Sequence, residues 1–110
     1  MSAFFESEII KEALDDINKL QEDVYGKLVH FHMMTYDEQI DHVSKLTELL
    51  DKQRIMYTRL SLSDDPDAVI MKESLNKTVT MMGYPEGTDI AVLFKNMHAT
   101  IDALKEFLEA

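Results

Sequence analysis

The sequence predicts an all-α protein, a single domain over residues 1–110 in which four amphipathic helices pack as a helical bundle. Apolar residues recur at intervals of three and four along most of the chain, which is the spacing of one helix face. No segment alternates with the period of a strand. Capping residues and helix breakers divide the pattern into four parts, each of which we assign to one helix.

The first two helices are predicted to form a long antiparallel hairpin. One runs over about residues 7–32, with Ser7 as its N-cap, and the other over about residues 36–62. Thr35 and Glu38 form a capping box at the start of the second helix. Since only about three residues separate two helices of similar length, the second must turn back along the first. Their apolar seams are Ile10, Ala13, Ile17, Leu20 and Val24, and Val43, Leu46, Leu50, Tyr57 and Leu60.

A third, shorter helix is predicted over about residues 66–82. Asp65 is placed to cap it, and Pro66 stands at the first helical position, where its missing N–H costs nothing. Gly83 falls where a left-handed residue commonly ends a helix, and Pro85 prevents continuation.

The fourth helix is predicted over about residues 89–109, with Thr88 or Asp89 as its N-cap. Because the first two helices are longer than the last two, part of the hairpin is left uncovered. A homodimer is the commonest way to bury such a patch, and the sequence favours it as one option. The seam of the fourth helix is Ile90, Leu93, Phe94, Met97, Ile101, Leu104 and Leu108.

The composition excludes several classes of protein. The 110 residues carry 21 acidic and 11 basic side chains, a formal charge of −10, so the chain lacks the excess of cations with which proteins bind duplex nucleic acid. The absence of cysteine excludes disulfides, thiolate catalysis and zinc knuckles. No segment resembles a signal peptide or a membrane span. We therefore expect a cytoplasmic protein that does not bind membranes.

Acidic pairs are the first candidates for chemistry. Acidic residues stand three apart in six places, where chance predicts about four. The heptad register of the first two predicted helices turns their three pairs towards solvent, whereas a magnesium site needs carboxylates that converge between helices. We interpret them as a solvated face. Three pairs resemble the ligands of helical magnesium-dependent nucleotide pyrophosphatases: Glu12 and Asp15, Glu38 and Asp41, and Glu48 and Asp51.

The residue patterns of other catalytic sites are also absent from the sequence. None of the four histidines follows a glutamate by three residues, as a di-iron site would require. His30 and His32 lie at a predicted helix end, where a cation complements the helix dipole, and this role is favoured over a shared metal. Neither a Gly-x-Ser-x-Gly element nor a glycine-rich phosphate loop occurs. The sequence predicts no catalytic residue, no metal site and no cofactor.

The placement of charge indicates a binding surface. Both ends of the chain are acidic, whereas residues 25–60 hold five acids and five bases. Arg54 and Arg59 flank Tyr57, and these residue types are enriched in binding hot spots, although the arginines could instead pair with acids of a neighbouring helix or loop. Methionine and tyrosine at the corner after the third helix add an adaptable apolar patch. The predicted partner-binding residues are Arg54, Tyr57, Arg59, Asp64, Asp65, Met82 and Tyr84.

Four segments together resemble a family of small, uncharacterised proteins from cyanobacteria and the phages that infect them. They are AFFESEI at residues 3–9, KQRIMYTRLSLSDDP at 52–66, MMGYP at 81–85 and NMHATI at 96–101. The resemblance covers nearly the whole chain and is most specific over residues 52–66. It implies the cytoplasm of a photosynthetic bacterium, in a host or phage setting, and transfers no activity or catalytic residue.

Together these observations predict a non-catalytic, acidic, helical protein that binds an unidentified protein partner. A magnesium-dependent nucleotide hydrolase built on a helical dimer is the first alternative. The second is a nucleic-acid mimic whose acidic face occupies a basic protein groove.

Overall fold

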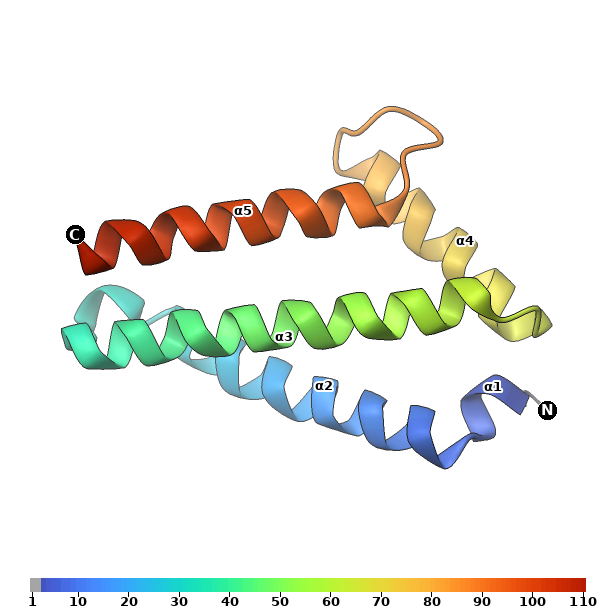
Figure 1. The fold of residues 1–110 in the computed structure, drawn as a ribbon, viewed down its shortest axis with the longest axis horizontal. Coiled ribbons are helices and arrows are strands. Elements are labelled where there is room, and N and C mark those ends of the chain that lie inside the picture. Colours follow the sequence, from blue (N-terminus) through green and yellow to red (C-terminus); the bar gives the residue numbers. More distant parts are fainter. Residues whose placement is uncertain (1–2) are drawn as a thin grey trace.

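The computed structural model describes residues 3–110, which form five α-helices and one 3-10 turn and contain no strand. The all-helical prediction is confirmed over this range, and each of the four predicted helices corresponds to one long helix. The elements are α1 (Ala3–Glu6), α2 (Glu8–Leu28), the 3-10 turn η1 (Phe31–Met33), α3 (Tyr36–Leu62), α4 (Pro66–Met81) and α5 (Ile90–Glu109) (Figure 1).

The start of α3 is fixed by the predicted capping box. The Glu38 N–H donates to Thr35 Oγ1 at 3.2 Å, and the Thr35 N–H donates to Glu38 Oε1 at 3.1 Å. These two bonds satisfy backbone donors that the first helical turn leaves without partners. The helix spans Tyr36–Leu62, as predicted.

Both ends of α4 are also determined by residues close to them in the sequence. Asp65 Oδ1 accepts the N–H of Asp67 at 3.0 Å, and Pro66 occupies the first helical position. The helix ends at Met81, one residue before the predicted end, and Gly83 follows with φ +102°. Only glycine adopts this left-handed conformation without steric cost, so the residue type explains the stop.

Of the two residues left open as the cap of α5, Asp89 is the one used. Asp89 Oδ1 accepts the Ala91 N–H at 2.9 Å. A second donor, the Ile90 N–H, is bound by Asn76 Oδ1 of α4 at 3.2 Å. The start of α5 is therefore anchored both by its own cap and by the preceding helix.

The N-terminal helix differs from the prediction at both ends. A separate turn of helix, Ala3–Glu6, precedes it, and Ser7 takes the N-cap position without a capping hydrogen bond from its side chain. The helix ends at Leu28 instead of residue 32. Beyond Val24 its seam leaves the core, since Leu28 is 52% exposed, so packing no longer favours the helical conformation over the turn.

All other long helices pack on α3. Figure 1 shows α2 and α5 lying along α3 on two sides, each antiparallel to it, while α4 crosses near the C-terminal end of α3. The predicted hairpin is the α2–α3 pair. The short α1 contacts α2 and α4, and α2 and α5 make almost no contact with each other.

Two hydrophobic clusters result from this arrangement. Leu49 of α3 packs with Ile17 and Val24 of α2, and its neighbour Leu50 belongs to a second cluster. Consecutive residues of a helix point about 100° apart, so one helix serves both clusters from adjacent sides. The second cluster consists of Leu50, Tyr57, Val79, Ile90 and Phe94.

The molecule is flat and open for its mass. Its extents are 46 × 34 × 20 Å and its radius of gyration is 15.8 Å, where a compact chain of this length would have about 13 Å. Its accessible surface is 7500 Å², where a compact monomer of 12.7 kDa would expose about 6200 Å². The molecule as a whole therefore exposes about 1300 Å² more than a compact monomer would.

A hydrogen bond between the side chains of Tyr57 and Asp89 connects α3 to the start of α5. The hydroxyl of Tyr57, a residue only 7% exposed, donates to Asp89 Oδ1 at 2.7 Å. Burial and this hydrogen bond raise the pKa of Tyr57. The Ala91 N–H and the Tyr57 hydroxyl lower the pKa of Asp89. Tyr57 of α3 thus holds the cap of α5 in its ionised form.

Replacing Tyr57 with Phe removes this hydroxyl and keeps the ring in the core. We expect Tyr57→Phe to lower the free energy of unfolding by about 1 to 2 kcal/mol, as measured by urea denaturation at pH 7. The matched control is Tyr84→Phe, because the Tyr84 hydroxyl only accepts an exposed hydrogen bond from Asn96. An equal loss in both variants would contradict the role given to Tyr57.

The difference in stability between wild type and Tyr57→Phe should also depend on pH. Because the pKa of Asp89 is lowered in the folded state, ionised Asp89 adds to the free energy of unfolding above the ordinary value of 3.8. This added stability is lost as the pH falls through the lower folded pKa. The stability difference between wild type and Tyr57→Phe should therefore be constant between about pH 5 and 8 and narrow below about pH 4. Urea titrations at a series of pH values measure it.

Candidate functional site

The seven residues predicted to bind a partner are not gathered at one place. The connection after α3 and the loop after α4 lie at opposite ends of a 16-residue helix, about 24 Å apart. The residues are divided between α3 (Arg54, Tyr57 and Arg59), the connection after α3 (Asp64 and Asp65) and the loop after α4 (Met82 and Tyr84).

Three of the seven have intramolecular roles. Tyr57 is buried beneath α4 and α5. Asp65 caps α4, and its second oxygen accepts the Phe4 N–H at 3.2 Å, which attaches α1 to the start of α4. Tyr84 is half-buried against the core, and its hydroxyl accepts from Asn96 Nδ2 at 3.1 Å. Of the predicted residues on α3, Arg54 and Arg59 therefore remain for binding a partner.

Arg54 and Arg59 are exposed and are not neutralised by neighbouring helices. Arg54 approaches only Asp51 of its own helix, at 3.9 Å, and Arg59 has no ion pair among residues 3–110. The alternative that these arginines pair with a neighbouring helix or the following loop is therefore not realised in the described chain. Exposed Ile55 lies between them on α3, and Lys95 of α5 stands beside Arg54.

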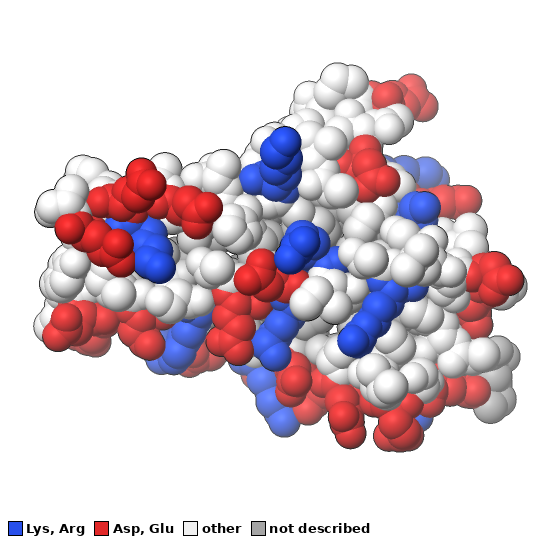
Figure 2. Space-filling model, viewed as in Figure 1, with Lys and Arg blue, Asp and Glu red and all other residues white. Residues whose placement is uncertain are grey.

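We call Arg54, Ile55, Arg59 and Lys95 the basic face. Figure 2 shows basic side chains interspersed with acidic ones over the middle of the molecule, with uncharged surface beside them. Two hollows flank Ile55. One, of about 440 Å³ between α3 and α5, is lined by Arg54 and Lys95; the other, of about 160 Å³ between α2 and α3, is lined by Ile55 and Arg59.

His98 lines the larger hollow, which lies between α3 and α5. His98 of α5 lies 3.1 Å from Asp102 on its own helix and 3.8 Å from Asp51 of α3. Apolar groups from Leu50 and Phe94 contribute to its lining. The hollow thus combines cations, carboxylates and apolar surface, which suits an extended segment of another protein better than a single ion.

The acidic pairs do not form a metal site in the described chain. Five of the six residues named as resembling magnesium ligands are exposed, and the sixth, Asp51, faces Arg54 and His98. Among residues 3–110, no three His, Asp or Glu side chains are grouped so as to hold a metal ion. His30 and His32 are exposed at the turn between α2 and α3.

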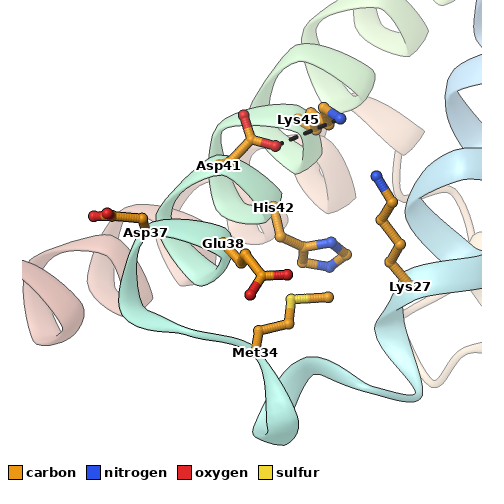
Figure 3. A pocket seen from close by; sticks show the side chains of 7 residues that line it. All are labelled: Lys27, Met34, Asp37, Glu38, Asp41, His42 and Lys45. Carbon is orange, nitrogen blue, oxygen red and sulfur yellow. Dashed lines mark ion pairs between the residues drawn. The ribbon is translucent and has the colours of Figure 1, made fainter.

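A buried histidine near the turn that joins α2 and α3 was not singled out from the sequence. His42 is 2% exposed, and both its ring nitrogens lack a hydrogen-bond partner in residues 3–110. It lines a hollow of about 330 Å³ (Figure 3), in which Lys27 reaches over from α2 and Met34 approaches the ring from below. Its position next to Val43, a residue of the predicted seam, and seven residues before the apolar Leu49 could have revealed its burial.

Charged groups surround His42 without bonding to it. Asp23 binds Lys27 at 3.1 Å and Lys45 at 3.2 Å, and Lys45 also pairs with Asp41 at 3.5 Å. Burial and then Lys27 lower the pKa of His42, and Lys45 adds to this, while Asp23 and Asp41 oppose it. The neutral imidazole is therefore the favoured form.

His42→Leu should stabilise the protein. At pH 7 we expect the free energy of unfolding to rise by about 1 kcal/mol, because two unsatisfied buried polar atoms are removed. The unfolded chain takes up a proton near the ordinary value of 6.5, while the folded pKa is lower, so wild type should lose stability as the pH falls below 6.5. The variant should lose less over that range. Thermal and urea denaturation from pH 7.5 to 5 measure both effects, and a matching gain in exposed His32→Leu would contradict the prediction.

The comparisons with known proteins place the chain in a family. Within residues 3–110, no helix is both long and apolar enough to cross a membrane. No curated protein and no solved structure gives a significant match. A family model described as a domain of unknown function, DUF1825, matches residues 2–108. The chain therefore belongs to the DUF1825 family of uncharacterised domains.

Proposed function

We propose that this protein is a non-catalytic interaction protein that binds an acidic segment of another protein through the basic face. What supports the proposal is the state of the cations on that face. In a chain with 21 acids and 11 bases, Arg59 and Lys95 lack an ion pair within the described residues, and Arg54 has one long contact. Cations held apart from this many carboxylates are available to a partner.

The chemistry of the face suits a protein ligand. Arginine donates in a fixed fork that matches a carboxylate, and it is enriched in binding hot spots. Exposed Ile55 between the two arginines supplies an apolar anchor, and the flanking hollows give side chains of the partner places to enter. An acidic partner would also be drawn to this face despite the net charge of −10, since long-range repulsion is screened within about 8 Å at physiological salt.

The resemblance to cyanobacterial and cyanophage proteins implies where to look for the partner. We infer a cytoplasmic setting in a photosynthetic bacterium, so the partner is sought in a cyanobacterial lysate. Binding through this face should weaken as salt is raised, because exposed charge pairs are screened.

The test is quantitative capture with a charge-matched control. The double variant Arg54→Ala/Arg59→Ala should recover the captured protein at least about tenfold less well than wild type, since each hot-spot arginine contributes more than about 1 kcal/mol. The control, Lys11→Ala/Lys19→Ala, removes the same charge from α2, where both lysines form exposed pairs within their own helix. It should leave recovery unchanged.

Two results would contradict the proposal. One is equal recovery by wild type and the arginine variant when circular dichroism shows both to be folded. The other is a rise in thermal stability with Mg²⁺ and a nucleotide, which at 100 times the dissociation constant amounts to about 2.7 kcal/mol and would favour the hydrolase alternative.

A further inference from the structure

A second surface lies on the other side of α3 from the basic face. Leu46, Gln53 and Tyr57 follow one another at intervals of seven and four, so they lie along one side of α3, between its contacts with α2 and α5. Tyr57 is buried there by Val79 of α4 and Phe94 of α5. Leu46 packs at the edge of the cluster shared with α2, but Leu46 and Gln53 are only half-buried, because α4 crosses near the far end of α3 (Figure 1).

Ion pairs show which sides of α2 and α5 flank this stripe. Asp16 and Asp23 of α2 bind Lys52 and Lys45 on the outer side of the hairpin. The opposite side of α2 therefore faces the stripe, and it carries Tyr25 and Leu28.

The same reasoning orients α5. His98 approaches Asp51 on the side of the basic face. The opposite side of α5, with Leu104 and Phe107, must face the stripe. We call Tyr25, Leu28, Leu46, Gln53, Leu104 and Phe107 the uncharged face.

The uncharged face is poorly covered. Phe107 is 77% exposed, Tyr25 56% and Leu28 52%. None of its six residues carries a charge, although the chain has a formal charge of −10. Large exposed apolar side chains from separate helices, grouped without charges, are typical of a protein interface.

We propose that the uncharged face binds a second copy of this chain in a two-fold symmetric dimer. The molecule also has surface to bury, since it exposes in total about 1300 Å² more than a compact monomer of its mass, and each partner in an interface of standard size buries roughly 800 Å². The charge fits as well. Two copies that each carry −10 repel, and they approach closely only where both surfaces are neutral, as they are when this face meets itself. This dimer does not depend on the proposed function, and it leaves both basic faces outward.

The dimer is tested with Phe107→Asp against Met81→Asp. Both residues are exposed, at 77% and 86%, and both changes add one negative charge, but Met81 lies outside the uncharged face. Light scattering and sedimentation should give wild type and Met81→Asp twice the 12.7 kDa of the chain. Phe107→Asp should dissociate at least tenfold more readily. A monomeric wild type, or a Phe107→Asp variant as dimeric as Met81→Asp, would overturn the proposal.

A second measurement locates the interface. Because the chain has no cysteine, Gln53→Cys provides a unique attachment point for a spin label. Dipolar coupling between labels then arises only between copies, and it should be strong at Gln53 and weaker at a label on Met81→Cys. Stronger coupling at Met81 would place the interface elsewhere and overturn the proposal.

Discussion

The apolar arc of α3 is wider than a single helix seam, and the rest of the structure depends on it. Leu49 faces α2 while Leu50 faces α4 and α5, so one helix supplies part of both hydrophobic clusters. Two helices that share a third in this way do not need to touch each other, and α2 and α5 barely do. The flat shape and the large accessible surface follow from that one helix.

The helix boundaries could be predicted from the sequence wherever they depend on local chemistry. The capping box at Thr35, the cap at Asp65 and the glycine after α4 each act within a few residues, so their types suffice to place them. The end of α2 could not be predicted in this way. It depends on whether Leu28 meets another helix, and α1 likewise depends on a hydrogen bond to Asp65, far along the chain.

The candidate site was harder to predict for the same reason. Tyrosine, arginine and aspartate are equally suited to bind a partner or to hold helices together, and residue type does not distinguish these uses. Tyr57 and Asp65 serve the fold because Asp89 and Phe4 lie opposite them, whereas Arg59 has no such neighbour in residues 3–110. The uncharged face combines three helices, so it becomes visible only when their relative rotation is known.

The bond between Phe4 and Asp65 spans 61 positions, whereas each long helix packs on α3, with α2 and α4 adjoining it in sequence. During synthesis, Phe4 leaves the ribosome well before the carboxylate that binds its N–H. At 5 to 20 residues per second, the interval is about 3 to 12 s. All residues of the α2–α3 hairpin are synthesised before Asp65. The turn of helix that contains Phe4 is thus among the first parts of the chain to be synthesised, yet it waits for a residue made 61 positions later, before α5 in turn is added.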